Sequence, residues 1–272
     1  MWKWEAKDAK GVIVIVHGAG EYHARYRWTV QQLNRLHYHV IMGDLPGQGT
    51  TSGARGHVKS FQQYIAVVKR WLEEARTYQL PIILFGHSMG GLISIHTTLS
   101  LKKKELPDVL LLSSPCLGLK NEPHRLKKAA ASFLNIVSPG MRFSSGQSGM
   151  GTRDEAMRQR DAADPLLIKR VSVRWYKELT KAMQAAQQKA DSFPDVPLLV
   201  TQSGEDRIVD KEAVRSWFDN LAVTDKYFKE WDGLYHEVLN EPEKNKVLAH
   251  LLGFVTIHIS LLECVQKDNG SA

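Results

Sequence analysis

The sequence predicts an α/β fold in which helices cover both faces of a mostly parallel central sheet. Short apolar runs rich in β-branched residues alternate with segments of helical periodicity along most of the 272 residues. The clearest run, 12–16, is apolar at every position, as expected for a strand buried on both faces. Between 116 and 190 no such run occurs, which predicts a helical insertion within a single α/β unit.

Five more strands and four helices of the sheet-and-helix body are predicted from the same two patterns. Shorter apolar runs predict strands over 39–42, 81–85, 109–112 and 196–201, with 227–231 as a weaker candidate. Helical spacing predicts helices over 24–36, 61–75, 92–101 and 211–221. Strands that alternate with helices in this way form a parallel sheet with helices on both faces.

The segment 247–265 is the only stretch that approaches a membrane span in length and composition. It is interrupted by His250 and His258, and its apolar residues fall on one side of a helix. This one-sided stripe predicts a packed C-terminal helix and not a transmembrane one.

The insertion divides the chain into a body, 1–115 and 191–272, and a segment 116–190. Two helices are predicted in it, over 125–137 and 166–189, the second opened by Asp164 as N-cap and Pro165. A polar stretch rich in Gly and Ser, 144–152, lies between them.

Composition excludes several classes of protein, and the distribution of charged residues locates the net positive charge in the insertion. With 43% hydrophobic and 24% charged residues the chain is neither disordered nor collagen-like. Its net charge of +7 comes from the insertion, which has 14 Lys and Arg against 6 Asp and Glu, a net +8. Few aromatic residues accompany these charges, which argues against nucleic-acid binding.

The two cysteines and the N-terminus bear on the compartment. Cys116 and Cys264 are too few for the disulfide framework of a small secreted protein, so we expect reduced, buried thiols. The first residues lack the apolar core of a signal peptide. We therefore expect a cytoplasmic protein.

Ser88 is the predicted nucleophile. It lies in Gly86-His87-Ser88-Met89-Gly90, a G-x-S-x-G sequence placed directly between a buried strand and a helix. In that context the motif forms a sharp turn that exposes the serine hydroxyl at the carboxyl edge of the sheet. The Met89 N–H, at the start of the helix, then points to where an oxyanion forms.

A second oxyanion donor is predicted after the first strand. The loop His17-Gly18-Ala19-Gly20 occupies the position that supplies the other donor in this arrangement, and we assign it to the Ala19 N–H. His17 is interpreted as a structural ring that holds the loop and transfers no proton.

The acid and base are predicted from chain order, which in this arrangement is Ser, then Asp or Glu, then His. Asp206 follows the late strand 196–201, and His236 follows the last strand, 227–231. Among the competitors, Glu205 points away if the backbone is extended, Asp210 suits a helix cap, and Asp232 lies on the wrong loop.

Metal and nucleotide chemistry lack their sequence signatures. The chain contains no H-E-x-x-H, paired C-x-x-C, G-x-x-x-x-G-K-[ST] or G-x-G-x-x-G sequence. We therefore expect no metal and no cofactor.

Five motifs in order resemble the monoacylglycerol lipase and lysophospholipase family of α/β-hydrolases, which is serine aminopeptidase S33-like. They are 17–26, the pair 44–49 and 52–57, 86–91, 204–207 and 233–237. The pattern is most similar to phospholipases and lysophospholipases of bacilli. The resemblance implies the α/β-hydrolase fold with a helical cap, or lid, at 116–190. It also implies the triad Ser88, Asp206 and His236 with oxyanion donors Ala19 and Met89.

The resemblance further implies a cofactor-free hydrolase of glycerolipid esters. A lysophospholipid or phospholipid is the first choice of substrate, and a monoacylglycerol the alternative. A serine aminopeptidase or thioesterase, and a non-catalytic lipid-binding protein, are the alternatives of other classes. The cap is where members of the family differ most, so the substrate is the least transferable part.

The first cap helix suggests a partner. Leu126, Ala130, Phe133, Leu134 and Val137 form an apolar stripe beside Arg125, Lys127 and Lys128. One interpretation is peripheral contact with an anionic membrane around an acyl-chain entrance, and the other is an ordinary solvated helix face.

Overall fold

A computed structural model describes residues 1–121, 132–144 and 149–270. Its centre is a seven-stranded sheet in the order β1-β3-β2-β4-β5-β8-β9. Only β1 runs antiparallel to its neighbour, so the mostly parallel sheet predicted from the sequence is confirmed. The strands are β1 (Trp2–Trp4), β2 (Gly11–Val16), β3 (Tyr38–Met42), β4 (Ile82–His87), β5 (Val109–Ser113), β8 (Leu198–Ser203) and β9 (Lys226–Trp231).

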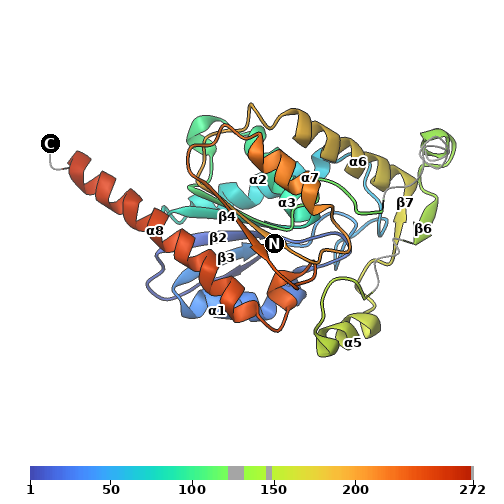
Figure 1. The fold of residues 1–272 in the computed structure, drawn as a ribbon, viewed down its shortest axis with the longest axis horizontal. Helices are drawn as coiled ribbons and strands as arrows, with labels where there is room; N and C mark the ends of the chain where they lie inside the picture. The colour runs from blue at the N-terminus through green and yellow to red at the C-terminus, as the bar shows by residue number, and fades with distance from the viewer. Residues whose placement is uncertain (122–131, 145–148, 271–272) are drawn as a thin grey trace.

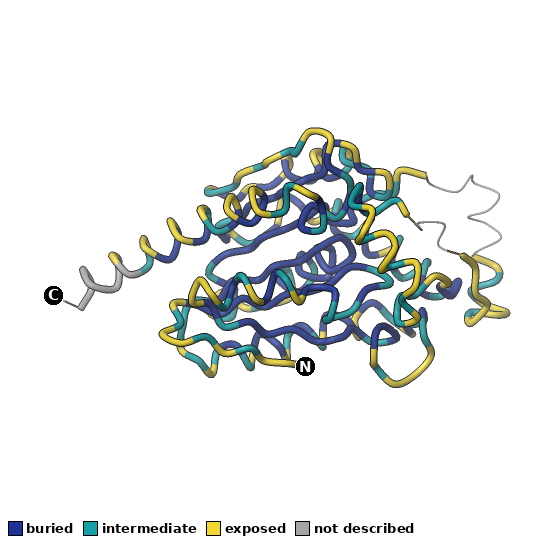
Figure 2. The backbone as a smooth tube through the Cα atoms, turned by 90° about the horizontal axis from the view of Figure 1, so that it is seen from below, coloured by how far each residue is buried: buried dark blue, intermediate teal, exposed yellow. Residues whose placement is uncertain are grey.

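Helices cover both faces of this sheet (Figure 1). One face is covered by α2 (Gln62–Arg76), α3 (Met89–Leu99), α6 (Val173–Gln188) and α7 (Lys211–Asp219). The other is covered by α1 (Arg27–Arg35) and α8 (Lys244–Gly270). Strand β2 shows why both faces need cover: Val12, Val14 and Val16 belong to the core on the first face, and Ile13 and Ile15 to the core on the second. The buried sheet between two partly exposed helical layers is visible in Figure 2.

The C-terminal helix packs through one stripe, as predicted. Val247, Leu251, Val255 and Ile259 are buried against the sheet. Within the described chain, Lys244–Leu262 is the helical stretch long and apolar enough to cross a membrane by composition. The far end of α8 extends beyond the body (Figure 1), and Cys264 there is exposed, so the expectation of two buried thiols is wrong for this residue.

The segment 116–190 holds β6 (Arg142–Ser144), α5 (Glu155–Ala163), β7 (Arg170–Ser172) and α6. The predicted helix 166–189 begins too early. Asp164 Oδ1 accepts a hydrogen bond from the Leu166 N–H and closes a turn, and the helix starts after Ser172, whose hydroxyl accepts from the Trp175 N–H. Much of the predicted helix 125–137 lies outside the described residues. The part of it that is described, 132–137, is helical.

Helix α5 was not predicted, and it packs differently from α6. Asp154 caps α5 by accepting from the Met157 N–H, but no residue of the helix is buried, so its sequence carries no apolar stripe. In contrast, Leu179, Met183 and Ala186 of α6 belong to the core on the first face of the sheet.

Candidate active site

Ser88 lies on a strained turn between β4 and α3. Its backbone has φ 54° and ψ −121°, a conformation that non-glycine residues adopt rarely and that is stored at functional sites. The turn brings the backbone of Gly90 against β2, where a Cβ at this position would lie 2.0 Å from the Val16 carbonyl oxygen. This close approach explains the glycine two residues after the serine.

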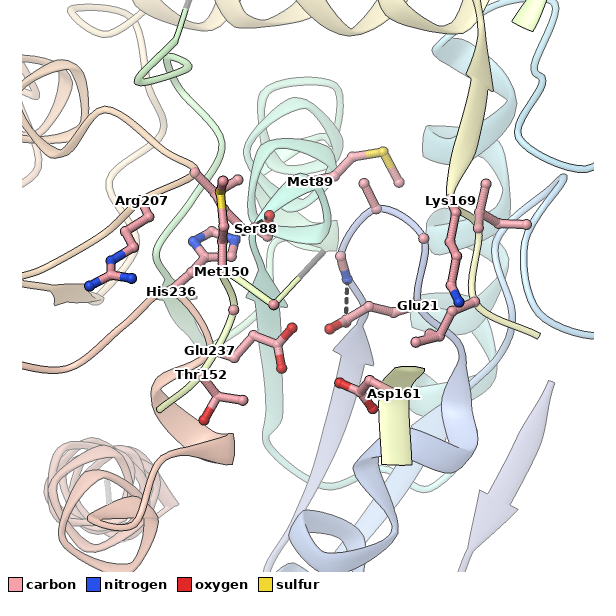
Figure 3. Close-up of a pocket in the computed structure, with 18 of the residues that line it drawn as sticks. Glu21, Ser88, Met89, Met150, Thr152, Asp161, Lys169, Arg207, His236 and Glu237 are labelled. Atoms are coloured by element: carbon pink, nitrogen blue, oxygen red, sulfur yellow. Dashed lines mark hydrogen bonds between the residues drawn. The ribbon is translucent and has the colours of Figure 1, made fainter. Parts of the chain in front are cut away.

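Ser88, His236 and Asp206 form one hydrogen-bonded chain. His236 Nε2 lies 2.8 Å from Ser88 Oγ, and His236 Nδ1 lies 2.8 Å from Asp206 Oδ2. Asp206 follows β8 and His236 follows β9, so parallel strands bring both loops to the edge at which Ser88 projects. The structure therefore brings together the three residues that the sequence predicts as a triad, and Figure 3 shows Ser88 beside His236.

The electrostatics of the Ser88–His236–Asp206 chain suit a general base, His236, that is oriented by a carboxylate, Asp206. Burial lowers the pKa of His236, but the charge and hydrogen bond of Asp206, together with the charges of Glu237 and Glu21, outweigh burial, so the net pKa lies above the usual value. Burial raises the pKa of Asp206, and the His236 ring with N–H donors from Val209 and Ile208 outweighs it, so that pKa lies below its usual range. The Asp206 carboxylate thus stays ionised and fixes the Nδ1–H tautomer, which leaves Nε2 to accept the Ser88 proton.

The competing acidic residues lie where the sequence placed them. Glu205 is exposed, and Asp210 caps α7 by accepting from the Glu212 N–H. Asp232 is exposed in the turn that leads from β9 toward His236.

The two predicted oxyanion donors are available. Met89 is the first residue of α3, and Ala19 lies in the loop after β2. Both residues line the cavity that contains Ser88. Among the described residues, neither of these two N–H groups has a hydrogen-bond partner.

A cavity of about 830 Å³ opens over Ser88 and His236. Its lining has an apolar part, contributed largely by the segment 116–190, and a charged part that comes from several segments of the chain. The apolar part includes Leu119, Phe143, Met150, Leu167, Ile168, Val171, Trp175, Tyr176 and Leu179, and the charged part includes Glu21, Arg25, Asp161, Arg207 and Glu237. Figure 3 shows several of these residues around Ser88. The size and character match a site for an amphipathic small molecule.

The charged part contains an arginine hub that the sequence did not reveal. Arg25 is 3% exposed in its side chain and binds three carboxylates: Glu21, Asp161 at 2.5 Å and Glu237 at 2.9 Å. Despite burial, Arg25 lowers the pKa of Glu21 to about 2. The four residues come from three distant parts of the chain. Glu21 and Arg25 lie in the motif 17–26 and Glu237 lies in the motif 233–237, but nothing in the sequence predicted their contact.

Comparison with known proteins places the chain in a family. The family model described as serine aminopeptidase, S33 matches residues 7–243. Phospholipase YtpA of Bacillus subtilis is 46% identical over 262 residues, covering 95% of this chain and all of that protein. Monoglyceride lipase of Rattus norvegicus is 30% identical, covering 96% of this chain and 86% of that protein.

A solved structure agrees with these relatives. The monoacylglycerol lipase of Paleococcus ferrophilus superposes with a TM-score of 0.85 at 28% identity, covering 94% of this chain and 98% of that one. The predicted α/β-hydrolase fold and the family resemblance are both confirmed. The chain therefore belongs to the serine aminopeptidase S33 family and is a hydrolase of the esterase and lipase type.

Proposed function

We propose that this protein hydrolyses a carboxylic ester of a glycerolipid, with a lysophospholipid or phospholipid as the preferred substrate. The observation that carries the proposal is the Ser88–His236–Asp206 chain at the base of a cavity with an apolar part and a charged part. An acyl chain fits the first part, and a polar head group the second. The 46% identity with Phospholipase YtpA supports the phospholipid, whereas the likeness to monoacylglycerol lipases supports the alternative substrate.

In the proposed mechanism Ser88 Oγ attacks the acyl carbonyl while His236 Nε2 takes the hydroxyl proton. Asp206 stabilises the imidazolium that forms, and the N–H groups of Ala19 and Met89 hold the oxyanion, each donor being worth roughly 10²–10³ in rate. His236 then protonates the departing alcohol oxygen. Water repeats the sequence on the acyl-enzyme and releases the fatty acid and free Ser88.

The segment 116–190 is proposed as a cap that also meets the membrane. Phe133 and Ile136 are 65% and 80% exposed, and Val137, Met141 and Phe143 are exposed as well. Arg142 and Arg170 lie among them on the paired strands β6 and β7. Apolar side chains flanked by cations suit the surface of an anionic bilayer, so we propose a cytoplasmic enzyme in peripheral contact with one. Leu126 and Ala130 of the predicted apolar stripe, and the neighbouring Arg125, Lys127 and Lys128, lie outside the described residues.

The test compares three substrates with one preparation: a lysophospholipid, a monoacylglycerol and a diacyl phospholipid. We expect kcat/KM to be highest for a phosphate-bearing substrate. A higher kcat/KM for the monoacylglycerol would instead identify monoacylglycerol as the preferred substrate. Ser88→Ala is expected to abolish turnover and labelling by a fluorophosphonate, and turnover that survives in this variant would refute the serine mechanism.

A further inference from the structure

The loop 17–20, here called the oxyanion loop, is held by side chains on both sides of Ala19. The Gly18 N–H donates to Glu21 Oε2 at 3.0 Å, a bond drawn as a dashed line in Figure 3. The Gly20 N–H donates to Gln48 Oε1 at 2.5 Å. Of three successive N–H groups, only that of Ala19 lacks a partner among the described residues.

Gln48 comes from the motif 44–49, whose role the proposed mechanism leaves open. It is 3% exposed and lies between Gly47 and Gly49, both at positive φ, in a turn that brings its side chain to the oxyanion loop. Gly49 cannot carry a side chain, since a Cβ there would lie 2.4 Å from Asp44 Oδ2. The motif is thus built around a sharp turn with Gln48 at its centre.

The segment 44–49 also forms a second hydrogen bond with the oxyanion loop. The Leu45 N–H donates to His17 Nε2 at 3.0 Å, so the proton of this ring lies on Nδ1, which is 2.8 Å from the Gly18 carbonyl oxygen. Burial lowers the pKa of His17, which keeps the ring neutral in this arrangement. His17 therefore has the structural role that its position in the sequence suggests.

We propose that Gln48 and Glu21 are positioning residues that aim the Ala19 N–H at the oxyanion. The proposal rests on the proposed function, in which Ala19 is one of the two donors. Donors stabilise an oxyanion strongly only when they are oriented before the charge develops. Glycines on both sides leave Ala19 in flexible backbone, with Gly20 at φ +81°, so the loop needs external restraint. Gln48 supplies it without adding a charge.

Gln48 is the better residue to test. Glu21 is one of the charges that raise the pKa of His236, so its removal would change the base as well as the loop. Gln48→Met keeps the length of the side chain and deletes the acceptor. Gln48→Glu restores an acceptor oxygen whether or not the carboxyl is ionised. The matched control is Gln63→Met, because Gln63 Oε1 likewise accepts from backbone N–H groups, those of Lys59 and Ser60, far from the site.

Turnover is measured on a soluble short-chain ester. We expect Gln48→Met to lower kcat roughly 10- to 100-fold while KM changes less than about twofold, because the Ala19 N–H that the variant leaves misaligned binds the oxyanion only in the transition state. Its affinity for a boronic acid, which mimics the tetrahedral adduct, should fall by a similar factor. Gln48→Glu should recover most of kcat, and Gln63→Met should keep all of it.

A folded Gln48→Met variant with unchanged kcat, or one whose loss lies in KM alone, would overturn the proposal. If that variant does not fold, Gln48→Asn withdraws the acceptor by one methylene, and the same expectations apply. The Ser88→Ala variant distinguishes failure of the positioning role from failure of the proposed function. Inactive Ser88→Ala with fully active Gln48→Met refutes only the positioning role, whereas active Ser88→Ala refutes the proposed function.

Discussion

Glu237 Oε2 lies 2.9 Å from Arg25 Nη2, and Glu237 directly follows His236 in the chain. This pair connects the arginine hub to the proposed base. Glu237 and Glu21 both add to the Asp206 carboxylate in raising the pKa of His236. The hub therefore bears on the pH at which the base is neutral and able to accept a proton.

The first prediction concerns that pH. A base works in its neutral form, so activity falls as the pH drops through the pKa of His236, which lies above the usual value for histidine. Glu237→Gln removes a negative charge and leaves Arg25 less compensated, and both changes disfavour the imidazolium. The acidic limb of kcat/KM against pH should move to lower pH.

Glu205→Gln is the control for this shift, because the exposed Glu205 adjoins Asp206 in the chain and is not among the main charges that raise the pKa of His236. An acidic limb that stays in place in Glu237→Gln, or moves equally in Glu205→Gln, would contradict the prediction.

The second prediction tests Asp206. Asp206→Asn keeps the size of the side chain but can present an N–H to His236 Nδ1, which stabilises the wrong tautomer. By analogy with other Ser-His-Asp hydrolases we expect kcat to fall about 10³- to 10⁴-fold. Asp210→Asn makes the same chemical change four residues away and keeps a good helix cap, so it should retain activity. A loss below about tenfold in Asp206→Asn would assign the orienting role to another group.

The third prediction compares two glycines. Gly90→Ala would place a Cβ 2.0 Å from the Val16 carbonyl oxygen, in backbone that cannot move cheaply, so it should cost about 3 kcal/mol or more of stability. In Gly253→Ala the added Cβ meets no atom within 4 Å in the middle of α8 and should stabilise by up to about 1 kcal/mol. Urea unfolding of both variants checks the signs, and a Gly90→Ala variant of native stability would show that the turn can relax.

The fourth prediction concerns the proposed membrane contact. Ile136→Ser combined with Arg142→Gln should weaken binding to vesicles that contain anionic lipid, because it removes an apolar anchor and a nearby cation. Turnover of a soluble short-chain ester should stay unchanged. The matched control is Ile257→Ser with Arg215→Gln, which makes the same changes on α8 and α7. Equal loss of vesicle binding and ester turnover would refute the contact.

Much of this site could be predicted because its signals are local. The strand before Ser88 is marked by a continuous apolar run, and the elbow glycines mark the turn between it and the helix that follows. Asp206 and His236 each follow a strand in the late part of the chain, and parallel strands bring their carboxyl ends to one edge. Their meeting with Ser88 is therefore a consequence of topology that chain order can predict.

The helices of the segment 116–190 were harder to predict. Helix α5 buries no residue, so no apolar stripe marks it. The start of α6 depends on Ser172, which sits in a β-bridge pattern with Arg142, thirty residues earlier. Asp164 and Pro165 predict a helix that starts at 166, but in the structure Asp164 closes a turn and the helix begins at Val173.

By itself the sequence determined the alternating strands and helices, the strained elbow at Ser88 and the order of the three proposed catalytic residues. Each of these depends on a few neighbouring residues or on the rule that parallel strands end together. Only the tertiary structure decided that Gln48 holds Gly20 and that Arg25 gathers Glu21, Asp161 and Glu237. Such contacts join residues far apart in the chain, and polar side chains carry no periodicity that announces a distant partner.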